Sequence, residues 1–261
     1  MKLDNKVAAV VTGGASGLGE ATARLLANSG VRVAVFDMNE ERGEIVAEDA
    51  DGIFCRVDVT SDESVAAGLA RARARHGVER ILVNCAGIVP GCKTVSRHHE
   101  TGAYVPHDMA TFRTGIEVNL IGTFRMIAAC AAAMAGLEPA TGDGARGVIV
   151  NTSSIAAQDG QIGQASYAAS KAGIAGLTLP VARDLAPLGI RVVTIMPGLF
   201  QTPMVEGLPP EIRKALEATI PFPSRLGKPQ EFAKLVRAVV DNDMLNGACI
   251  RLDGALRMQP K

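Results

Sequence analysis

Aromatic residues are scarce in this chain of 261 residues: they make up 3% of it, with no Trp and only two Tyr. Such a composition argues against an aromatic-rich β-sandwich. Glycine is abundant instead, with 28 residues, and hydrophobic residues make up 48% of the chain. Small residues favour close packing of helices on a sheet, and a chain of this length lies near the upper limit for one core. We therefore expect a single α/β domain over residues 1–261.

The cysteines are few, odd in number and without CxxC spacing, which excludes a disulfide framework and a zinc site. They are Cys55, Cys85, Cys92, Cys130 and Cys249. Three of the four histidines, His98, His99 and His107, fall in one loop and lack the Cys or carboxylate partners that define a metal site. We expect free thiols in a reducing compartment, a solvated histidine loop and no metal.

An excess of charge of either sign is also missing, because Lys plus Arg and Asp plus Glu number 27 each. Without a basic block or stripe, nucleic acid is excluded as the main partner. No uninterrupted apolar stretch approaches the roughly 20 residues that span a bilayer. The polar start Met1–Lys6 leaves no room for a secretory apolar segment. We expect a cytoplasmic protein that binds a small molecule and no membrane.

Short β-branched runs alternate with longer helical patterns along the chain. Their apolar character is nearly continuous rather than alternating, which indicates strands covered on both faces. Thr60, with Glu63 three residues later, forms a capping-box pattern that predicts a helix over Ser61–His76. We predict a Rossmann fold with a doubly wound seven-stranded parallel sheet and helices on both faces. The predicted strands are Val7–Val11, Val31–Phe36, Ile53–Val57, Ile81–Val83, Val148–Val150, Ile190–Ile195 and Cys249–Leu252.

Two stretches are interpreted as long loops, Ile88–Met109 and Gly198–Lys228. Both follow strands, and ligands of open α/β sheets bind beyond the carboxyl ends of the strands. We therefore place both loops at the rim of the active site and interpret the second as a lid. Near its start, Phe200 and Thr202 are expected at the cofactor. Farther on, Met204, Val205 and Leu208 offer apolar contact to a substrate, with ordinary packing as the alternative.

A glycine-rich turn, Thr12–Gly19, follows the first strand and leads into a helical pattern. Glycines let a backbone approach a pyrophosphate, which the helix N-terminus then stabilises. Asp37 ends the second strand, about 20 residues farther on, where a carboxylate accepts the ribose hydroxyls of NAD and repels the 2′-phosphate of NADP. Asp58, after the third strand, is a candidate for the adenine pocket. An ordinary turn is the alternative for each of these features.

Tyr167 and Lys171 stand four residues apart in a predicted helix, so both side chains emerge on one face. A neighbouring ammonium and a cationic nicotinamide both favour the phenolate, which lets Tyr167 exchange a proton with an alcohol or a ketone. Ser154 follows a strand and is placed to hold the substrate oxygen as charge develops. Alone, Ser154 is also typical of a turn, and Asn119 of a polar helix surface.

Together, these motifs resemble the ordered set of the short-chain dehydrogenase/reductase family. They are Thr12-Gly13-xxx-Gly17-x-Gly19, Asn84-Cys85-Ala86-Gly87, Asn119, Ser154, Tyr167-xxx-Lys171 and Pro197-Gly198. The resemblance implies that Tyr167 is the acid/base, that Ser154 holds the oxygen, and that Lys171 modulates Tyr167 and binds ribose. Asn119 would support a proton relay. Cys85 departs from the commonest family pattern, which has a second Asn there.

The residues that the motifs and the resemblance together assign to NAD are Gly13, Ser16, Gly17, Leu18, Gly19, Asp37, Asp58, Val59, Asn84, Cys85, Ala86, Gly87, Tyr167, Lys171, Pro197, Gly198, Phe200 and Thr202. Those assigned to substrate are Ser154, Gln161, Gln164, Tyr167, Met204 and Leu208.

A narrower similarity, densest from Gly147 onward, is to the subfamily of type-2 3-hydroxyacyl-CoA dehydrogenases, also described as 17β-hydroxysteroid dehydrogenases. It rests on segments such as Gln161–Gln164, Leu179–Pro187, Pro221–Gly227 and Ile250–Gly254. The resemblance implies NAD-linked oxidation of an L-3-hydroxyacyl-CoA in fatty acid metabolism by a homotetramer. The stretch 88–109 is longer than the family's loop, which weakens the substrate assignment. A steroid or other secondary-alcohol dehydrogenase, and an NAD-binding scaffold subunit, remain the alternatives.

Overall fold

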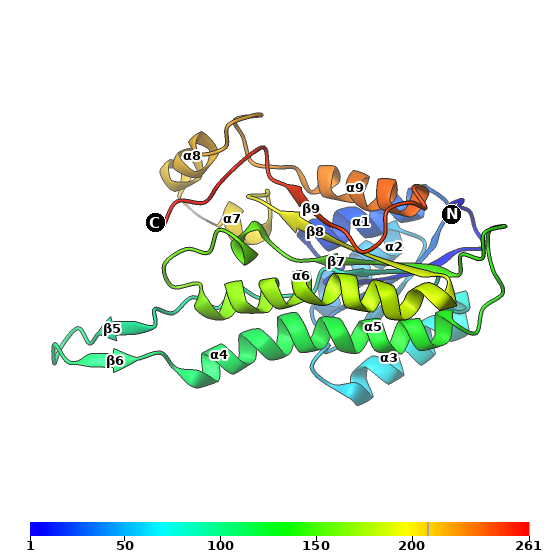
Figure 1. The fold of residues 1–261 in the computed structure, drawn as a ribbon, viewed down its shortest axis with the longest axis horizontal. Helices are drawn as coiled ribbons and strands as arrows, with labels where there is room; N and C mark the ends of the chain where they lie inside the picture. Colours follow the sequence, from blue (N-terminus) through cyan, green and yellow to red (C-terminus); the bar gives the residue numbers. More distant parts are fainter. Residues whose placement is uncertain (208, 261) are drawn as a thin grey trace.

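The computed structural model describes residues 1–207 and 209–260, and its main sheet has seven parallel strands in the order β3-β2-β1-β4-β7-β8-β9 (Figure 1). This arrangement confirms the predicted Rossmann fold and all seven predicted strands. The strands are β1 Ala8–Thr12, β2 Arg32–Asp37, β3 Ile53–Arg56, β4 Ile81–Asn84, β7 Gly147–Thr152, β8 Ile190–Pro197 and β9 Cys249–Leu252. The topology reverses between β1 and β4, where ligands of such sheets bind.

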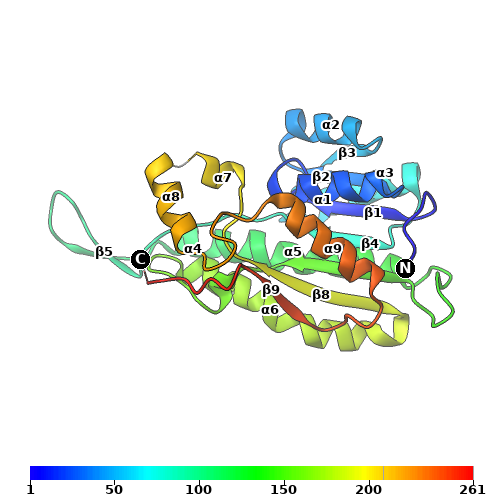
Figure 2. The same cartoon turned by 90° about the horizontal axis from the view of Figure 1, so that it is seen from above.

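Helices cover both faces of the sheet, as expected from strands without alternation (Figure 2). Val11 of β1 packs in the core with side chains of α1 and α9, whereas the neighbouring Val10 packs with those of α3 and α5. Side chains along a strand alternate between faces, so each β1 valine is buried by a different helix layer. One layer is α1 Gly17–Asn28, α2 Glu40–Asp49 and α9 Pro229–Asp241, and the other is α3 Asp62–His76, α5 Gly122–Met134 and α6 Ala165–Leu185.

Helix α3 has a different cap from the one predicted. Its N-cap is Ser61, whose hydroxyl accepts a hydrogen bond from the Ser64 N–H at 3.2 Å. Thr60 instead donates its backbone N–H and its hydroxyl to the Asp58 carboxylate. The predicted capping box at Thr60 is therefore wrong by one residue, because Asp58 competes for Thr60.

Residues Met109–Met134 form one continuous helical run, made of α4 Met109–Ile116, a π-helical turn η1 Glu117–Ile121 and α5. By length and composition this run is apolar enough to cross a membrane, although Arg113, Glu117 and Arg125 lie within it. The run packs against α6 and against strands β4 and β7. A core helix of a folded domain meets the same criterion, so the criterion is weak support for a membrane span.

Both stretches interpreted as loops contain regular structure, so that interpretation was wrong in part. Residues 88–109 include an exposed antiparallel hairpin of β5 Val95–Arg97 and β6 Tyr104–Pro106, which projects from the body of the molecule (Figure 1). Residues 198–228 contain α7 Pro203–Glu206 and α8 Pro210–Ala218. Each of these two helices has proline in its first turn, where a missing N–H costs nothing.

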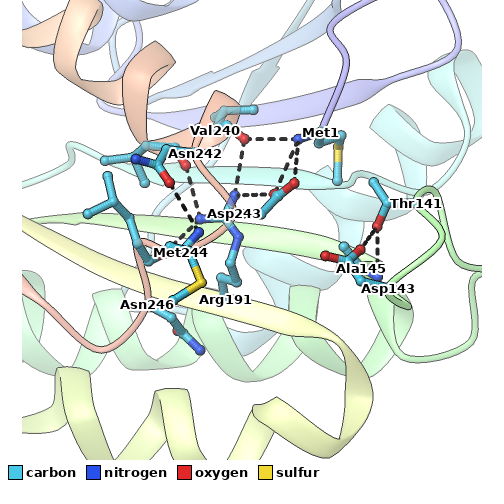
Figure 3. Close-up of polar contacts among 12 residues, drawn as sticks. Met1, Thr141, Asp143, Ala145, Arg191, Val240, Asn242, Asp243, Met244 and Asn246 are labelled. Atoms are coloured by element: carbon cyan, nitrogen blue, oxygen red, sulfur yellow. Dashed lines mark hydrogen bonds and ion pairs between the residues drawn. The ribbon is translucent and has the colours of Figure 1, made fainter.

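A buried cation fastens the end of α9 to the start of β8 (Figure 3). Arg191 of β8 donates to the carbonyl oxygens of Val239 and Val240 at 2.9 and 3.1 Å. It also donates to the Asp243 carboxylate at 3.2 Å. The last carbonyls of a helix lack partners within the helix, so the guanidinium caps α9 while Asp243 balances its charge.

Candidate active site

A cavity of about 1300 Å³ lies at the carboxyl ends of the strands. Residues that follow β1, β2, β3, β4, β7 and β8 line it, as expected for a parallel α/β sheet. The predicted site residues in its wall are Gly13, Ser16, Gly17, Leu18, Gly19, Asp37, Asp58, Val59, Cys85, Ala86, Gly87, Ser154, Gln164, Tyr167, Lys171, Pro197, Gly198, Phe200 and Thr202. Asn84, Asn119 and Gln161 lie outside the wall, and Leu208 and the side chain of Met204 lie outside the described part of the chain.

The glycine-rich turn is shaped by contacts that only glycine permits. Gly13 has a φ of +62°, and a Cβ there would lie 2.7 Å from the Ala86 nitrogen. A Cβ on Gly19 would lie 2.1 Å from the Gly13 oxygen. Thr12 fixes the turn against the end of β4, because its hydroxyl accepts from the N–H groups of Cys85 and Ala86, each at 3.2 Å. The backbone therefore forms a tight cradle at the start of α1.

The N-terminus of α1 suits an anion. Its N-cap Ser16 makes no side-chain capping bond among the described residues, so its hydroxyl and the first N–H groups of the helix are not used by a cap. Such a helix end stabilises negative charge. Gly17, the first helical residue, has a φ of +54° and lines the cavity. The cradle and the helix end together fit the pyrophosphate of a dinucleotide.

Asp37 and Asp58 occupy the far part of this cofactor end. The two Asp37 carboxylate oxygens accept from the Ala15 and Asn39 N–H groups, each at 3.0 Å, so Asp37 also holds the glycine-rich turn in place. Hydrogen bonds from Thr60 hold the pKa of Asp58 below its ordinary value, which keeps this carboxylate charged at neutral pH. Both carboxylates line the cavity as predicted.

Asn84 is placed differently from the prediction. It is 3% exposed, and its amide nitrogen donates to the Asn151 side-chain oxygen at 2.9 Å. The two residues are register partners on β4 and β7, so the bond lies within the sheet. The structure assigns Asn84 to the pairing of these strands, while the Cys85, Ala86 and Gly87 that follow it line the cavity.

Ser154 and Tyr167 meet at the middle of the cavity wall. Ser154 caps a short 3-10 turn, η2 Ile155–Ala157, by accepting from the Ala156 N–H at 3.1 Å. Burial raises the pKa of the Tyr167 phenol, and a hydrogen bond with Ser154 opposes that effect. The net shift in the protein alone is upward, contrary to the lowering expected from the neighbouring ammonium, because burial dominates. The phenol is held protonated and aimed at Ser154, as needed for proton exchange with an oxygen bound between them.

Lys171 is a buried amine on the same face of α6 as Tyr167. Its Nζ lies 5.8 Å from the centre of the Tyr167 ring and donates to the Thr152 carbonyl at 2.9 Å. Burial lowers the pKa of Lys171 from its ordinary value of 10.5 to about 8. The Ser153 hydroxyl donates to the Lys171 carbonyl at 2.6 Å, so the end of β7 holds this turn of α6 in place.

Asn119 lies in the π-helical turn η1 and is fully buried. Its side chain accepts from the Ile88 N–H at 2.8 Å and donates to the Ile88 carbonyl at 2.9 Å. It also donates to the Ser170 hydroxyl at 3.0 Å, and Ser170 in turn donates to the Tyr167 carbonyl. Asn119 thus positions the segment after β4 against the catalytic helix. Its role in a proton relay remains a prediction.

Several positioning residues escaped the sequence reasoning. Thr12, Thr152, Ser153 and Ser170 each bind a group of a segment distant in the sequence, so no local pattern marks them. Their position in the sequence was the one available signal. Ser170 lies between Tyr167 and Lys171, and the other three lie at the ends of strands. Short polar residues at strand ends of a parallel sheet are candidates for this task.

We expect Lys171→Met to stabilise the fold while impairing turnover. At pH 7 the lysine is charged in the folded and the unfolded chain, so the full cost of burying the ammonium, about 3 kcal/mol for this pKa shift, is present. After the loss of one hydrogen bond, the net gain is about 2 kcal/mol. As pH rises from 8 toward 10.5, Lys171 loses its proton in the folded protein before it does in the unfolded chain. The difference in unfolding free energy between Lys171→Met and wild type therefore decreases. Urea unfolding of both proteins at pH 7 and pH 10 measures this difference, and an equal gap at both pH values would contradict the assignment.

Comparison with known proteins agrees with this geometry. Residues 7–213 match the model of the short chain dehydrogenase family. The chain is 52% identical over 254 residues to the 3-hydroxyacyl-CoA dehydrogenase type-2 of Rattus norvegicus, covering 97% of this chain and 95% of that protein. The corresponding protein of Homo sapiens is 49% identical over 255 residues, with the same coverage.

A solved structure shares the whole fold. The crystal structure of 3-hydroxyacyl-CoA dehydrogenase type-2 from Mycobacterium avium covers 100% of both chains, with a TM-score of 0.93 and 41% sequence identity. Members of this family generally use NAD or NADP. The scaffold alternative therefore falls away, and the chain belongs to the short-chain dehydrogenase family of oxidoreductases.

Proposed function

We propose that this enzyme oxidises L-3-hydroxyacyl-CoA thioesters to 3-oxoacyl-CoA with NAD. The observation that carries the proposal is the sequence identity of 49–52% to type-2 3-hydroxyacyl-CoA dehydrogenases over almost the whole chain. The cavity supports it: its volume of about 1300 Å³ exceeds the roughly 300–1000 Å³ of a typical small-molecule site, which leaves room for a substrate beside a dinucleotide.

The side chains supply proton transfer and orientation. NAD held at the glycine-rich turn and at Asp37 would supply the acceptor for the hydride of the substrate's carbinol carbon. The Ser154 hydroxyl orients the substrate oxygen, and the Tyr167 oxygen takes the hydroxyl proton as the carbonyl forms. For this step the phenol must first lose its own proton, so burial of Tyr167 opposes the reaction. The Lys171 ammonium and a bound cationic nicotinamide would both act against this cost, because positive charge favours the phenolate.

The test compares kcat/KM for acetoacetyl-CoA with NADH against a steroid ketone and a cyclic ketone. We expect the thioester to be turned over most efficiently. Fast steroid reduction beside undetectable thioester turnover would contradict the proposal.

A secondary-alcohol dehydrogenase that does not use thioesters is the second candidate. A relative 38% identical over 252 residues is the cis-4-hydroxycyclohexanecarboxylate dehydrogenase of Sinomonas cyclohexanicum. Its name describes a hydroxyl on a ring, so the family scaffold also accepts compact alcohols. In the same assay, a higher kcat/KM for the cyclic ketone than for the thioester would favour this second candidate.

The preference for NAD over NADP is assigned to the charge of Asp37. The neighbouring Gly14, Ala15 and Met38 carry no cation, and Arg42 of α2 pairs with Glu20 at 3.1 Å. A 2′-phosphate near Asp37 is therefore repelled without compensation. We expect Asp37→Ala to weaken NAD more than NADP and to shift the ratio of their Kd values by about tenfold, or 1.4 kcal/mol. Fluorescence titration measures both affinities.

Two controls sharpen this titration. Asp37→Asn keeps the shape and one acceptor, so it removes the charge while retaining the hydrogen bond from the Ala15 N–H; the bond from the Asn39 N–H is lost. Glu44→Ala removes an exposed carboxylate of α2 outside the cavity wall and should change neither affinity. If both Asp37 variants lost affinity for NAD and NADP equally, Asp37 would not be the residue that recognises the ribose.

We further propose that the enzyme is a cytoplasmic homotetramer that acts in fatty acid metabolism. Exposed apolar side chains on η1, α5 and α6 support the assembly: Ile121 is 41%, Phe124 51% and Leu179 44% exposed. The five cysteines, all within the described residues, are free, which suits a reducing compartment. Light scattering of the purified protein measures the assembly, and fractionation of the source cells its location.

A further inference from the structure

The segment after β9 returns to the substrate part of the cavity. Met258 lines the cavity and packs on a small apolar cluster that contains Ile155, the residue directly after Ser154. Val205 of α7 packs on the same cluster and lines the same cavity. In both views the C-terminus lies at the end of the molecule that carries α7 and α8 (Figures 1 and 2). Met258 therefore lies on the side of Ile155, next to Ser154, and of Val205 in α7.

Two hydrogen bonds fix the far end of this segment to the loop before α6. The Ile162 N–H donates to the Pro260 carbonyl at 3.0 Å, and the Gln161 side chain donates to the Gln259 carbonyl at 2.8 Å. Gln161, which the sequence had suggested as a substrate ligand, is thus engaged with the backbone of the residue directly after Met258. Its neighbour Gln164 remains in the cavity wall.

A partly buried arginine fixes the near end. Arg251 of β9, whose side chain is 18% exposed, donates to the Leu256 carbonyl at 2.9 Å and pairs with Asp253 at 2.7 Å. It also pairs with Asp159 at 2.6 Å and donates to the Gln158 side chain at 2.7 Å. Asp159 follows the 3-10 turn that Ser154 caps. One guanidinium therefore holds the C-terminal segment and the catalytic loop in a fixed relation.

We infer that residues 256–260 form a fixed end wall of the substrate cavity and that the Met258 side chain limits the length of the acyl chain that fits. The inference rests on the proposed function for the identity of the substrate. A terminal segment without anchors would yield to a longer chain, but this one is anchored on both sides of Met258. Shortening or enlarging its side chain therefore changes the room at the end of the cavity.

The test measures kcat/KM with NADH for acetoacetyl-CoA, 3-oxooctanoyl-CoA and 3-oxododecanoyl-CoA. We expect Met258→Ala to raise the ratio of long-chain to short-chain kcat/KM by about tenfold and Met258→Trp to lower it similarly. A change of one methylene in an apolar pocket alters discrimination by roughly 10- to 200-fold. Met244→Ala, the same substitution at a side chain 90% exposed and outside the cavity wall, should leave the ratio unchanged.

Gln161→Leu supplies a variant with Met258 intact. It removes the donor to the Gln259 carbonyl, so we expect a smaller shift in the direction of Met258→Ala, with unchanged Kd for NAD. If the ratio of long-chain to short-chain kcat/KM stayed within twofold of wild type in both Met258→Ala and Gln161→Leu, the inferred end wall would be wrong, whether or not Met258→Trp folds. If wild type turns over no thioester, the proposed function fails by itself, and the same variants are then compared on 2-alkanols of increasing length with NAD. If the variants showed the same chain-length preference as wild type on 2-alkanols, the inferred end wall would also be wrong.

Discussion

Tyr167→Phe is expected to lower kcat by at least about 100-fold while leaving the Kd for NAD nearly unchanged. The substitution removes one oxygen atom and keeps the ring that lines the cavity. Proton transfer by a positioned side chain contributes typically 10²–10⁴ to the rate, and Ser154 and Lys171 provide no replacement for the phenolic oxygen. Steady-state kinetics and fluorescence titration of NAD measure the two quantities separately.

The chain offers a matched control in its only other tyrosine. Tyr104 lies on β6 of the exposed hairpin and is 79% exposed. We expect Tyr104→Phe to retain wild-type kcat. If Tyr167→Phe also kept its turnover, another group would have to move the proton, and the central role of the phenol would be lost.

Glu79→Ala is expected to produce the largest loss of stability, about 3 kcal/mol. The Glu79 side chain is 1% exposed and forms a two-pronged pair with Arg73, with contacts of 2.6 and 3.0 Å. The guanidinium also donates to the Ala129 carbonyl at 3.2 Å, so the pair joins α3 to α5. Removing one partner leaves the other partly buried without its counter-charge, which typically costs about 3–5 kcal/mol; the 28% exposure of Arg73 places the loss at the lower end.

Thermal unfolding measures this loss as a decrease in Tm of roughly 6–12 °C, because a chain of this size shifts by about 2–4 °C per kcal/mol. Asp241→Ala is the control. It breaks the Arg237–Asp241 pair of α9, whose side chains are 53% and 49% exposed, and should cost less than about 1 kcal/mol. Equal effects of the two substitutions would show that burial does not distinguish these ion pairs.

Local pattern was enough for the elements of the sheet. The central predicted strands are short apolar runs that must be buried on both faces, and that requirement holds wherever the run lies in the fold. The same is true of Gly13 and Gly19, because only glycine tolerates the contacts of 2.7 and 2.1 Å that a Cβ would make. Tyr167 and Lys171 share one helix face through their spacing alone.

Local pattern failed where another contact competes for the same side chain. Thr60 looks like a cap, yet Asp58 takes its hydroxyl, and Ser61 caps α3 instead. Asn84 belongs to a cofactor motif, yet its side chain pairs with Asn151, which is distant in the sequence and adjacent in the sheet. In both cases the partner is brought near by tertiary structure or by a neighbouring turn, which periodicity does not describe.

The sequence by itself determined the family, the seven strands of the main sheet and the pairing of phenol and amine, since each depends on residue types and their spacing along the chain. Only the tertiary structure decided how the site is closed. Arg251, Gln161 and Ile162 bring the C-terminal segment to the cavity, and burial brings the pKa of Lys171 to about 8. Both results come from groups far apart in the chain that desolvate or bind one another, and such effects exist only once the chain is packed.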